Sequence, residues 1–291
     1  KLVLSKKLIL LAGPTASGKS NLAIKLAKKI NGEIINADSM QVFKEFTILS
    51  SRPGTIQMRK VKHHLYGIIS VKKHFSAGDW FKQAKKKIKI CLKKKKVPII
   101  VGGTGLYFNT ITKGISKIPN IDKKTRNKVR NLYKKLGIKR FYKQLLNLDP
   151  KIKYKIPQTD PQRLQRAYEV KLKTKKSLFD WFANTKSDLL DFEIKKIFIE
   201  TPRELLLKKI SIRTEQMFRN KCIDEVKKFN RLKINKNLSV NKLIGVQEIN
   251  DFLRGSISLE QCKDLINIKT RQYAKRQNTW ALSLIHISEP T

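Results

Sequence analysis

Short apolar runs that end in polar or glycine-rich turns recur along the first third of the chain. Three of them predict buried strands, at residues 8–12, 33–36 and 97–101. Between these strands, apolar residues at helical spacing predict helices over 21–30 and about 80–92. Strands that alternate with helices are typical of an α/β fold with a parallel sheet, whose ligand lies at the carboxyl ends of the strands. All three polar turns fall at that edge.

The pattern changes after residue 112. Residues 113–188 carry 22 Lys and Arg against 6 Asp and Glu, with helical periodicity and no run typical of a buried strand. A strand at 194–200 then returns to the sheet, and Pro202 precedes one long predicted helix over 203–229. We therefore expect residues 1–112 to form the first part of the core, 113–188 a basic helical insertion, and 189–280 the completion of the core with C-terminal helices. Residues 281–291 differ in composition from the rest and are left out of the fold prediction.

The charge of the chain is extreme for its length. Its 291 residues include 65 Lys and Arg against 22 Asp and Glu, which gives a formal net charge of +43. Such a surface attracts polyanions, of which nucleic acid is the first candidate. A coding sequence rich in A and T also enriches Lys, Ile and Asn together, so the charge alone does not establish nucleic-acid binding.

Cysteine content and hydropathy restrict the class of protein further. The three cysteines are widely separated and form neither a disulfide framework nor a paired metal motif, which favours a reducing cytoplasm. No apolar run approaches the roughly 18 to 20 residues needed to cross a bilayer, and no signal peptide is predicted. We therefore expect a cytoplasmic protein with no membrane partner.

The first polar turn contains a complete phosphate-binding motif. The segment GPTASGKS follows a predicted strand, precedes a predicted helix and matches G-x-x-x-x-G-K-[ST]. Backbone N–H groups of such a loop surround an anion, the lysine adds positive charge, and the hydroxyl that follows can ligate Mg²⁺. The predicted anion site comprises Gly13, Pro14, Thr15, Ala16, Ser17, Gly18, Lys19 and Ser20, with Ser20 as the Mg²⁺ ligand. The fold class is thus a P-loop parallel sheet flanked by helices, with a basic helical insertion domain.

The motif alone would indicate an enzyme that uses a nucleoside triphosphate. However, the strand before Gly102 ends in GGTG, where such enzymes usually carry an acidic Mg²⁺ ligand. The nearest acid at a strand end is Asp38, which is followed by Ser39, Met40 and Gln41. Asp38 at this edge could accept a proton from a nucleophile, or it could cap the following segment, since Asp is a preferred N-cap.

Seven segments together resemble a known family. GPTASGKS, ADSMQVFK, RPG with HHL soon after, VGGTGLYF, DPQRLQRAYEV, IGVQEI and TRQYAKRQNTW occur in the order seen in bacterial tRNA dimethylallyltransferases, also called tRNA isopentenyltransferases. The resemblance covers about residues 8–280. It implies transfer of a dimethylallyl group from dimethylallyl diphosphate to N6 of the adenosine 3′ of the anticodon, in tRNAs that read codons beginning with U. It also implies a monomer that binds the anticodon stem-loop and uses Mg²⁺.

The same resemblance implies roles for particular residues. Asp38 would take the proton from N6, Thr104 would contact the substrate near the reacting centre, and Arg213 would hold the pyrophosphate. The residues implied to contact tRNA are Asp38, Ser39, Met40, Gln41, Thr104, Arg126, Gln162, Arg163, Leu164, Gln165 and Arg166. In so basic a chain, Arg163, Arg166 and Arg213 could instead be solvated helix residues.

One stretch and two single positions depart from the family pattern. Residues 44–51 replace a stretch that usually contains two glycines, Lys209 stands where the family tends to have Arg, and Lys221 stands where it often has Gly.

Two other functions stay open. They are a P-loop small-molecule kinase and a basic nucleic-acid-binding protein that uses the loop as a structural anion site. A kinase needs neither the DPQRL segment nor a basic insertion, and a passive binder has no use for Asp38 beside the loop.

Overall fold

The computed structural model describes residues 6–235 and 238–286. The chain forms two compact units, Lys1–Ile111 with Asp191–Thr291, and Thr112–Leu190. The first unit contains the sheet, and the second is built from helices of the basic segment. In the parts of the chain described, no helix is long and apolar enough to cross a bilayer.

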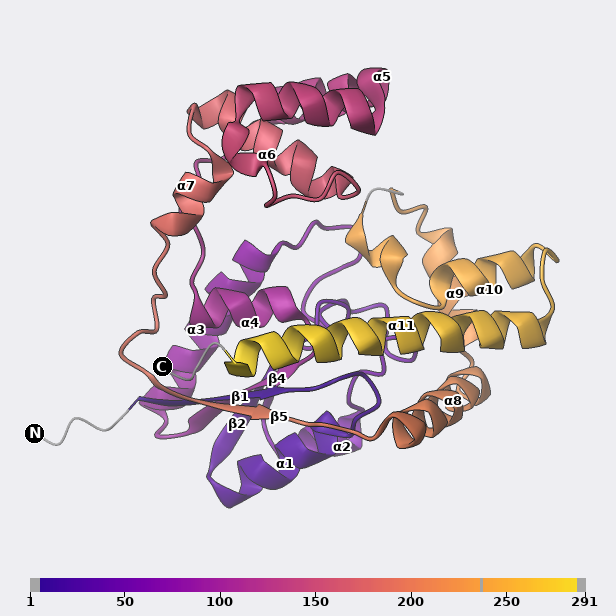
Figure 1. The fold of residues 1–291 in the computed structure, drawn as a ribbon. Coiled ribbons are helices and arrows are strands. Elements are labelled where there is room, and N and C mark those ends of the chain that lie inside the picture. The colour runs from indigo at the N-terminus through magenta and orange to yellow at the C-terminus, as the bar shows by residue number, and fades with distance from the viewer. Residues whose placement is uncertain (1–5, 236–237, 287–291) are drawn as a thin grey trace, which may run out of the picture. The chain divides into compact units, whose positions relative to one another are not determined.

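A five-stranded sheet forms the centre of the first unit (Figure 1). Its strands are β1 (Lys7–Ala12), β2 (Gly32–Ala37), β3 (His63–His64), β4 (Val97–Gly102) and β5 (Glu193–Phe198). Their order is β3-β2-β4-β1-β5, and all neighbours pair in parallel. The predicted parallel α/β sheet is therefore confirmed. Strand β3 was not predicted, because two residues are too few to show a periodic pattern.

Helices cover both faces of the sheet, as a parallel sheet requires. On one face, Ile9, Leu11 and Ile34 pack against Ala23 and Ile24 of α1 (Lys19–Lys29). Figure 1 shows α3 (Ala77–Lys93) on the opposite face. There the buried indole N–H of Trp80 donates to the backbone oxygen of Asn36 at 2.7 Å. This packing fixes the carboxyl ends of the strands, where the polar turns lie.

The remaining helices of the first unit were predicted less well. They are α2 (Thr55–Lys60), α4 (Gly105–Thr112), α8 (Arg203–Arg219), α9 (Cys222–Arg231), η2 (Ser239–Lys242), α10 (Val246–Leu253) and α11 (Leu259–His286). The single helix expected over 203–229 is wrong, because the chain breaks between α8 and α9. At the break Lys221 has φ 66°, a left-handed conformation that glycine adopts far more readily. Glycine, which the family resemblance leads us to expect at this position, would adopt this conformation without strain.

The loop at residues 44–51 is held by one carboxylate instead of by glycine turns. Glu225 of α9 accepts backbone N–H bonds from Thr47 at 2.6 Å, Ile48 at 2.9 Å and Leu49 at 2.9 Å. The Glu225 side chain is buried, so these bonds compensate for the loss of its hydration. The loop without glycines therefore has a defined anchor in this chain.

The second unit consists of helices around its own apolar core. Its elements are α5 (Lys123–Leu148), η1 (Pro150–Ile152), α6 (Pro161–Thr174) and α7 (Leu178–Ala183). Helix α5 is kinked at Gly137, whose φ is 67°. Phe141, Leu145 and Leu164 are fully buried in this core. Asp160 accepts the Arg163 N–H at 3.0 Å and Pro161 occupies the first turn, so the DP of DPQRL starts helix α6.

Candidate active site

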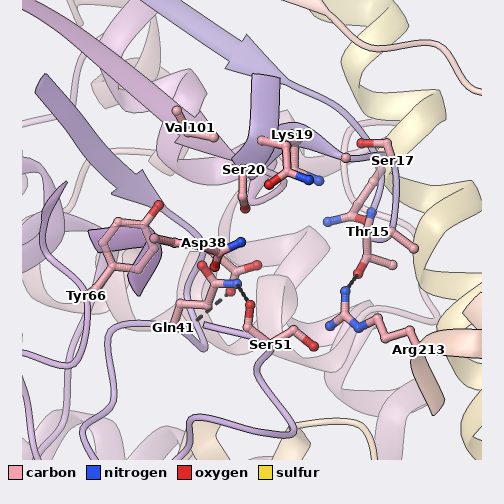
Figure 2. Close-up of a pocket in the computed structure, with 16 residues that line it drawn as sticks. Thr15, Ser17, Lys19, Ser20, Asp38, Gln41, Ser51, Tyr66, Val101 and Arg213 are labelled. Carbon is pink, nitrogen blue, oxygen red and sulfur yellow. Dashed lines mark hydrogen bonds between the residues drawn. The ribbon is translucent and has the colours of Figure 1, made fainter. Parts of the chain in front are cut away.

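A cavity of about 220 Å³ opens at the carboxyl ends of β1, β2 and β4 (Figure 2). Its lining comes from the phosphate-binding loop, the turn after β2, the segment leading into α2, and helices α8 and α11. Among the predicted site residues, the cavity is lined by Thr15, Ala16, Ser17, Gly18, Lys19, Ser20, Asp38, Gln41 and Arg213. The sheet thus brings together residues that are up to about 200 positions apart in the chain.

The phosphate-binding loop has the geometry of an anion nest. Ala16 has φ 63° and Gly18 has φ 89°, so left-handed residues occur twice within three positions. Such alternation turns neighbouring N–H groups toward one point, and α1 begins directly after the loop at Lys19. The hydroxyl of Ser17 is buried beside the cavity and has no hydrogen-bond partner in the part of the chain that the structure describes. A buried polar atom without a partner at this place fits a site built for a polar ligand.

The charge of Lys19 is poorly stabilised when the cavity holds no anion. Its ammonium donates to the backbone oxygen of Pro14 in the same loop. The Lys19 pKa is lowered to about 7, chiefly by burial; the carboxylate of Asp38 opposes the lowering and the positive charge of Arg213 adds to it. A bound anion would favour the charged form, so ligand binding and protonation of Lys19 are coupled.

Arg213 reaches the loop from helix α8. Its guanidinium donates to the Thr15 hydroxyl oxygen at 2.5 Å (Figure 2). The Nε of Arg213 is buried and has no hydrogen-bond partner within residues 6–235 and 238–286, and burial lowers the pKa of the guanidinium. An exposed helix arginine would have neither property. Arg213 therefore lies beside the phosphate-binding loop at the cavity.

The sequence left open whether Asp38 caps the following segment or faces a ligand, and in the structure it does the first while lining the cavity. One carboxylate oxygen accepts the N–H groups of Met40 at 2.8 Å and Gln41 at 3.3 Å, in the manner of a cap. The Asn36 side chain fixes the backbone of Asp38, whose N–H it accepts at 2.8 Å. The second carboxylate oxygen of Asp38 has no hydrogen-bond partner among the described residues. Because Asp38 lines the cavity, this oxygen is available to a ligand.

Thr104 lies behind Asp38 and does not itself line the cavity. Its hydroxyl oxygen accepts the Ser39 N–H at 3.0 Å, and its backbone N–H donates to Ala37 at 3.2 Å. Thr104 thus ties the turn after β4 to the turn after β2. Gln41 lines the cavity, but its amide N–H₂ donates to the backbone oxygens of residues 50 and 51. Ser39 and Met40 are half-buried beside it.

The other predicted tRNA contacts lie in the second unit. Gln162 and Arg163 are exposed on α6, and Arg163 pairs with Asp160 at 3.3 Å. Arg126 is half-buried near the start of α5, and its buried Nε has no partner among the residues described. Leu164 is fully buried among the core residues of this unit. Its side chain therefore belongs to the core, which corrects its predicted role as a tRNA contact. Gln165 and Arg166, also on α6, are half-buried.

Sequence reasoning missed several residues that line the cavity. Tyr66 and Gln277 belong to it, as do Ser51 and Gln57. Burial and the nearby Asp38 charge raise the pKa of the Tyr66 hydroxyl, which keeps it protonated. Tyr66 directly follows the HHL segment, and Gln277 lies inside TRQYAKRQNTW. Both segments were recognised as blocks, but no periodicity or spacing within them indicates which side chain faces a ligand.

A second polar cluster lies away from the cavity. Glu33, His64 and Cys91 are buried together, with the His64 Nε2 at 2.6 Å from a Glu33 oxygen. Two ligands of one metal ion are usually more than about 3 Å apart, as bond lengths of 2.0–2.3 Å to a tetrahedral ion require. The geometry is that of a hydrogen-bonded pair, and the buried His64 side chain has a structural role.

Comparisons with known proteins identify the class to which this site belongs. A family model described as IPP transferase matches residues 41–283. The chain is 55% identical to the tRNA dimethylallyltransferase of Pelagibacter ubique over 94% of this chain and 88% of that protein. It is 42% identical to the tRNA dimethylallyltransferase of Rickettsia massiliae over 94% of this chain and 76% of that protein.

Solved structures agree with the sequence comparisons. A eukaryotic dimethylallyltransferase acting on tRNA superposes with a TM-score of 0.83 at 29% identity, covering 95% of this chain and 70% of that one. The tRNA isopentenylpyrophosphate transferase of Bacillus halodurans gives a TM-score of 0.67 at 30% identity, covering 94% and 86%. The chain belongs to the IPP transferase family.

Proposed function

We infer that this protein is a tRNA dimethylallyltransferase. The observation that carries the inference is the anion nest beside Asp38, at a sheet edge where β4 ends in Gly102 without an acidic residue. Such a site can hold a diphosphate as a leaving group while a carboxylate faces the incoming nucleophile. The relatives named above are dimethylallyltransferases, and they do not favour the kinase alternative.

The donor in this proposal is dimethylallyl diphosphate. Its diphosphate would lie on the loop N–H groups, with Lys19 and Arg213 on either side. Displacement at an allylic carbon develops negative charge on the departing diphosphate, so donors fixed in advance at that charge accelerate the reaction. The unpaired Nε of Arg213 and hydroxyl of Ser17 supply such donors without breaking other bonds.

The donor set also fits the Mg²⁺ expected from the motif. The Ser20 hydroxyl is a hard oxygen donor at the cavity, and Asp38 is the one acidic residue among the described residues that line it. Mg²⁺ bound mainly through substrate phosphates needs no more than one or two protein oxygens. Ser20 would hold the ion, whose chemical contribution is to neutralise charge on the diphosphate.

Asp38 is the proposed general base for the acceptor nucleotide. The free carboxylate oxygen accepts a proton from the exocyclic N6 of adenosine as the new C–N bond forms. The allylic C–O bond breaks and its electron pair leaves with the diphosphate. Thr104 holds the Asp38 turn through the Ser39 N–H, which keeps the carboxylate aimed at the nucleophile.

The second unit is the proposed platform for the anticodon stem-loop. Residues 113–188 carry 22 basic against 6 acidic side chains, a net formal charge of +16. Extraction of the adenosine 3′ of the anticodon costs a few kcal/mol of stacking, which phosphate contacts must offset. Exposed Gln162 and Arg163 are suited to such contacts, and Arg126, half-buried near the start of α5, is the weaker candidate. Preference for codons beginning with U, a monomeric state and a cytoplasmic location complete the proposal.

The test is direct. The protein is incubated with bulk tRNA, Mg²⁺ and dimethylallyl diphosphate, and the tRNA is digested to nucleosides for mass spectrometry. We expect a prenylated adenosine that depends on the donor. Unmodified tRNA together with turnover of ATP on a small acceptor would instead establish the kinase.

A further inference from the structure

The buried side chain of Gln277 connects two turns of the active site. Its amide oxygen accepts the Thr15 N–H at 2.7 Å, and its amide nitrogen donates to the Gly103 oxygen at 3.1 Å. Only 5% of the residue is exposed. Thr15 belongs to the phosphate-binding loop after β1, whereas Gly103 belongs to the turn after β4. One residue of α11 therefore bridges the two turns by hydrogen bonds to their backbones.

Both bonds require a neutral amide in one orientation. A flipped amide would oppose N–H to N–H and oxygen to oxygen, so the partners determine which end is which. The fit also depends on Gly103, because a Cβ there would lie 2.0 Å from the Gln277 nitrogen. A methionine at 277 would fill a similar volume but make neither hydrogen bond.

The two turns serve different parts of the proposed reaction: one would bind the leaving diphosphate, and the other supports the proposed base. The Thr15 hydroxyl also accepts a hydrogen bond from the Arg213 guanidinium, so Thr15 belongs to the proposed diphosphate site. Gly103 precedes Thr104, whose hydroxyl holds the Ser39 N–H next to Asp38. Gln277 therefore joins the part that would hold the leaving group to the part that would carry the base.

Neighbouring residues of α11 reinforce this bridge. Burial raises the pKa of the Tyr273 hydroxyl, one turn earlier, and the neighbouring Thr104 and Gln277 side chains oppose that rise. Trp280, almost one turn later, packs so closely on Gly105 that a Cβ there would lie 2.4 Å from the indole. These positions share one helix face because they are four and three residues apart. The C-terminal helix thus covers the turn after β4 from end to end.

We propose that Gln277 is a positioning residue, which sets the distance between the diphosphate loop and the Asp38–Thr104 edge. The proposal rests on the transfer reaction inferred above. In-line displacement requires reacting atoms about 3–3.5 Å apart, and a misplacement of about 1 Å can cost 10²-fold in rate. Gln277 does not have to touch either substrate to act in this way.

The test compares Gln277→Met with Gln272→Met, the same substitution at an exposed position of the same helix. We expect Gln277→Met to lower kcat by about 10- to 100-fold while KM for donor and tRNA changes less than about threefold. Gln272→Met should match the wild type. A wild-type kcat in folded Gln277→Met overturns the proposal, as does a loss that appears only in KM.

A second variant keeps the test decisive if Gln277→Met does not fold. Gly103→Ala should displace the Gln277 amide and lower kcat by a similar factor, and the double variant should be no slower than the slower single one. A normal kcat in Gly103→Ala, or two losses that multiply, contradicts the bridge. If the wild type itself transfers no prenyl group, the proposed function fails. If the wild type is active and the variants match it, only the role of Gln277 fails.

Discussion

Lys19 offers a quantitative link between the structure and the binding of the donor. Its pKa is about 7 in the ligand-free site, chiefly because the ammonium is buried. A bound diphosphate adds negative charge to that of Asp38, which moves the pKa of Lys19 back toward its ordinary value of about 10.4. Donor binding should therefore take up a proton between about pH 7 and pH 10.

The sign and size of the effect follow from that shift. Because the pKa of Lys19 rises on binding, the affinity for the donor is highest below pH 7. It declines as the pH rises through the pKa that Lys19 has before binding. With the free-site pKa at about 7, the apparent Kd should increase roughly 5-fold from pH 7 to 8 and about 50-fold from pH 7 to 9. The ligand adds little to this change, since a phosphate ester completes its last ionisation near pH 6.

Calorimetry can measure both quantities without tRNA. Titration of dimethylallyl diphosphate at pH 7, 8 and 9, in two buffers of different ionisation enthalpy, gives the Kd and the number of protons taken up. The matched control is Lys19→Met, which should bind more weakly and with a flat pH dependence. An affinity of the wild type that is constant from pH 7 to 9, or an equal slope in Lys19→Met, would refute the reasoning.

Three further predictions test other parts of the account. Asp38→Ala should lower kcat by about 10²-fold or more, as loss of a general base does, while a mobility-shift assay still detects tRNA binding; undiminished turnover removes Asp38 from the base role. Lys221→Gly should raise the free energy of unfolding in urea by about 1 kcal/mol, because it relieves a left-handed lysine. The control Asn220→Gly, at φ −84°, should give no gain, and equal gains from both would contradict the strain argument. Affinity for tRNA should fall steeply with salt; a flat response would remove the basic second unit from the interface.

The fold was largely predictable because its signals are local and repeated. Apolar runs bounded by turns located β1, β2, β4 and β5 to within one or two residues. The break between α8 and α9 was missed because Lys221 gives no local sign of a left-handed conformation. Likewise, the two residues of β3 acquire their strand geometry only by pairing with β2.

The candidate site was predictable where a motif carries its own geometry. The phosphate-binding loop is such a case, since glycine positions and the strand–loop–helix order specify an anion nest. Gln277 could not be found in this way, because its role arises from contacts with residues 174 and 262 positions away. The burial of Leu164 was also hidden, because a resemblance identifies a conspicuous segment without saying which of its side chains face the core.

The measurement that tests the central claim most directly uses a defined anticodon stem-loop with adenosine 3′ of the anticodon. The protein, Mg²⁺ and dimethylallyl diphosphate are added, and the product is digested and analysed by mass spectrometry. A stem-loop with guanosine at that position serves as the control. We predict a prenyl group on N6 of that adenosine and none on the control. An unmodified adenosine in the presence of folded protein that binds both substrates would contradict the account.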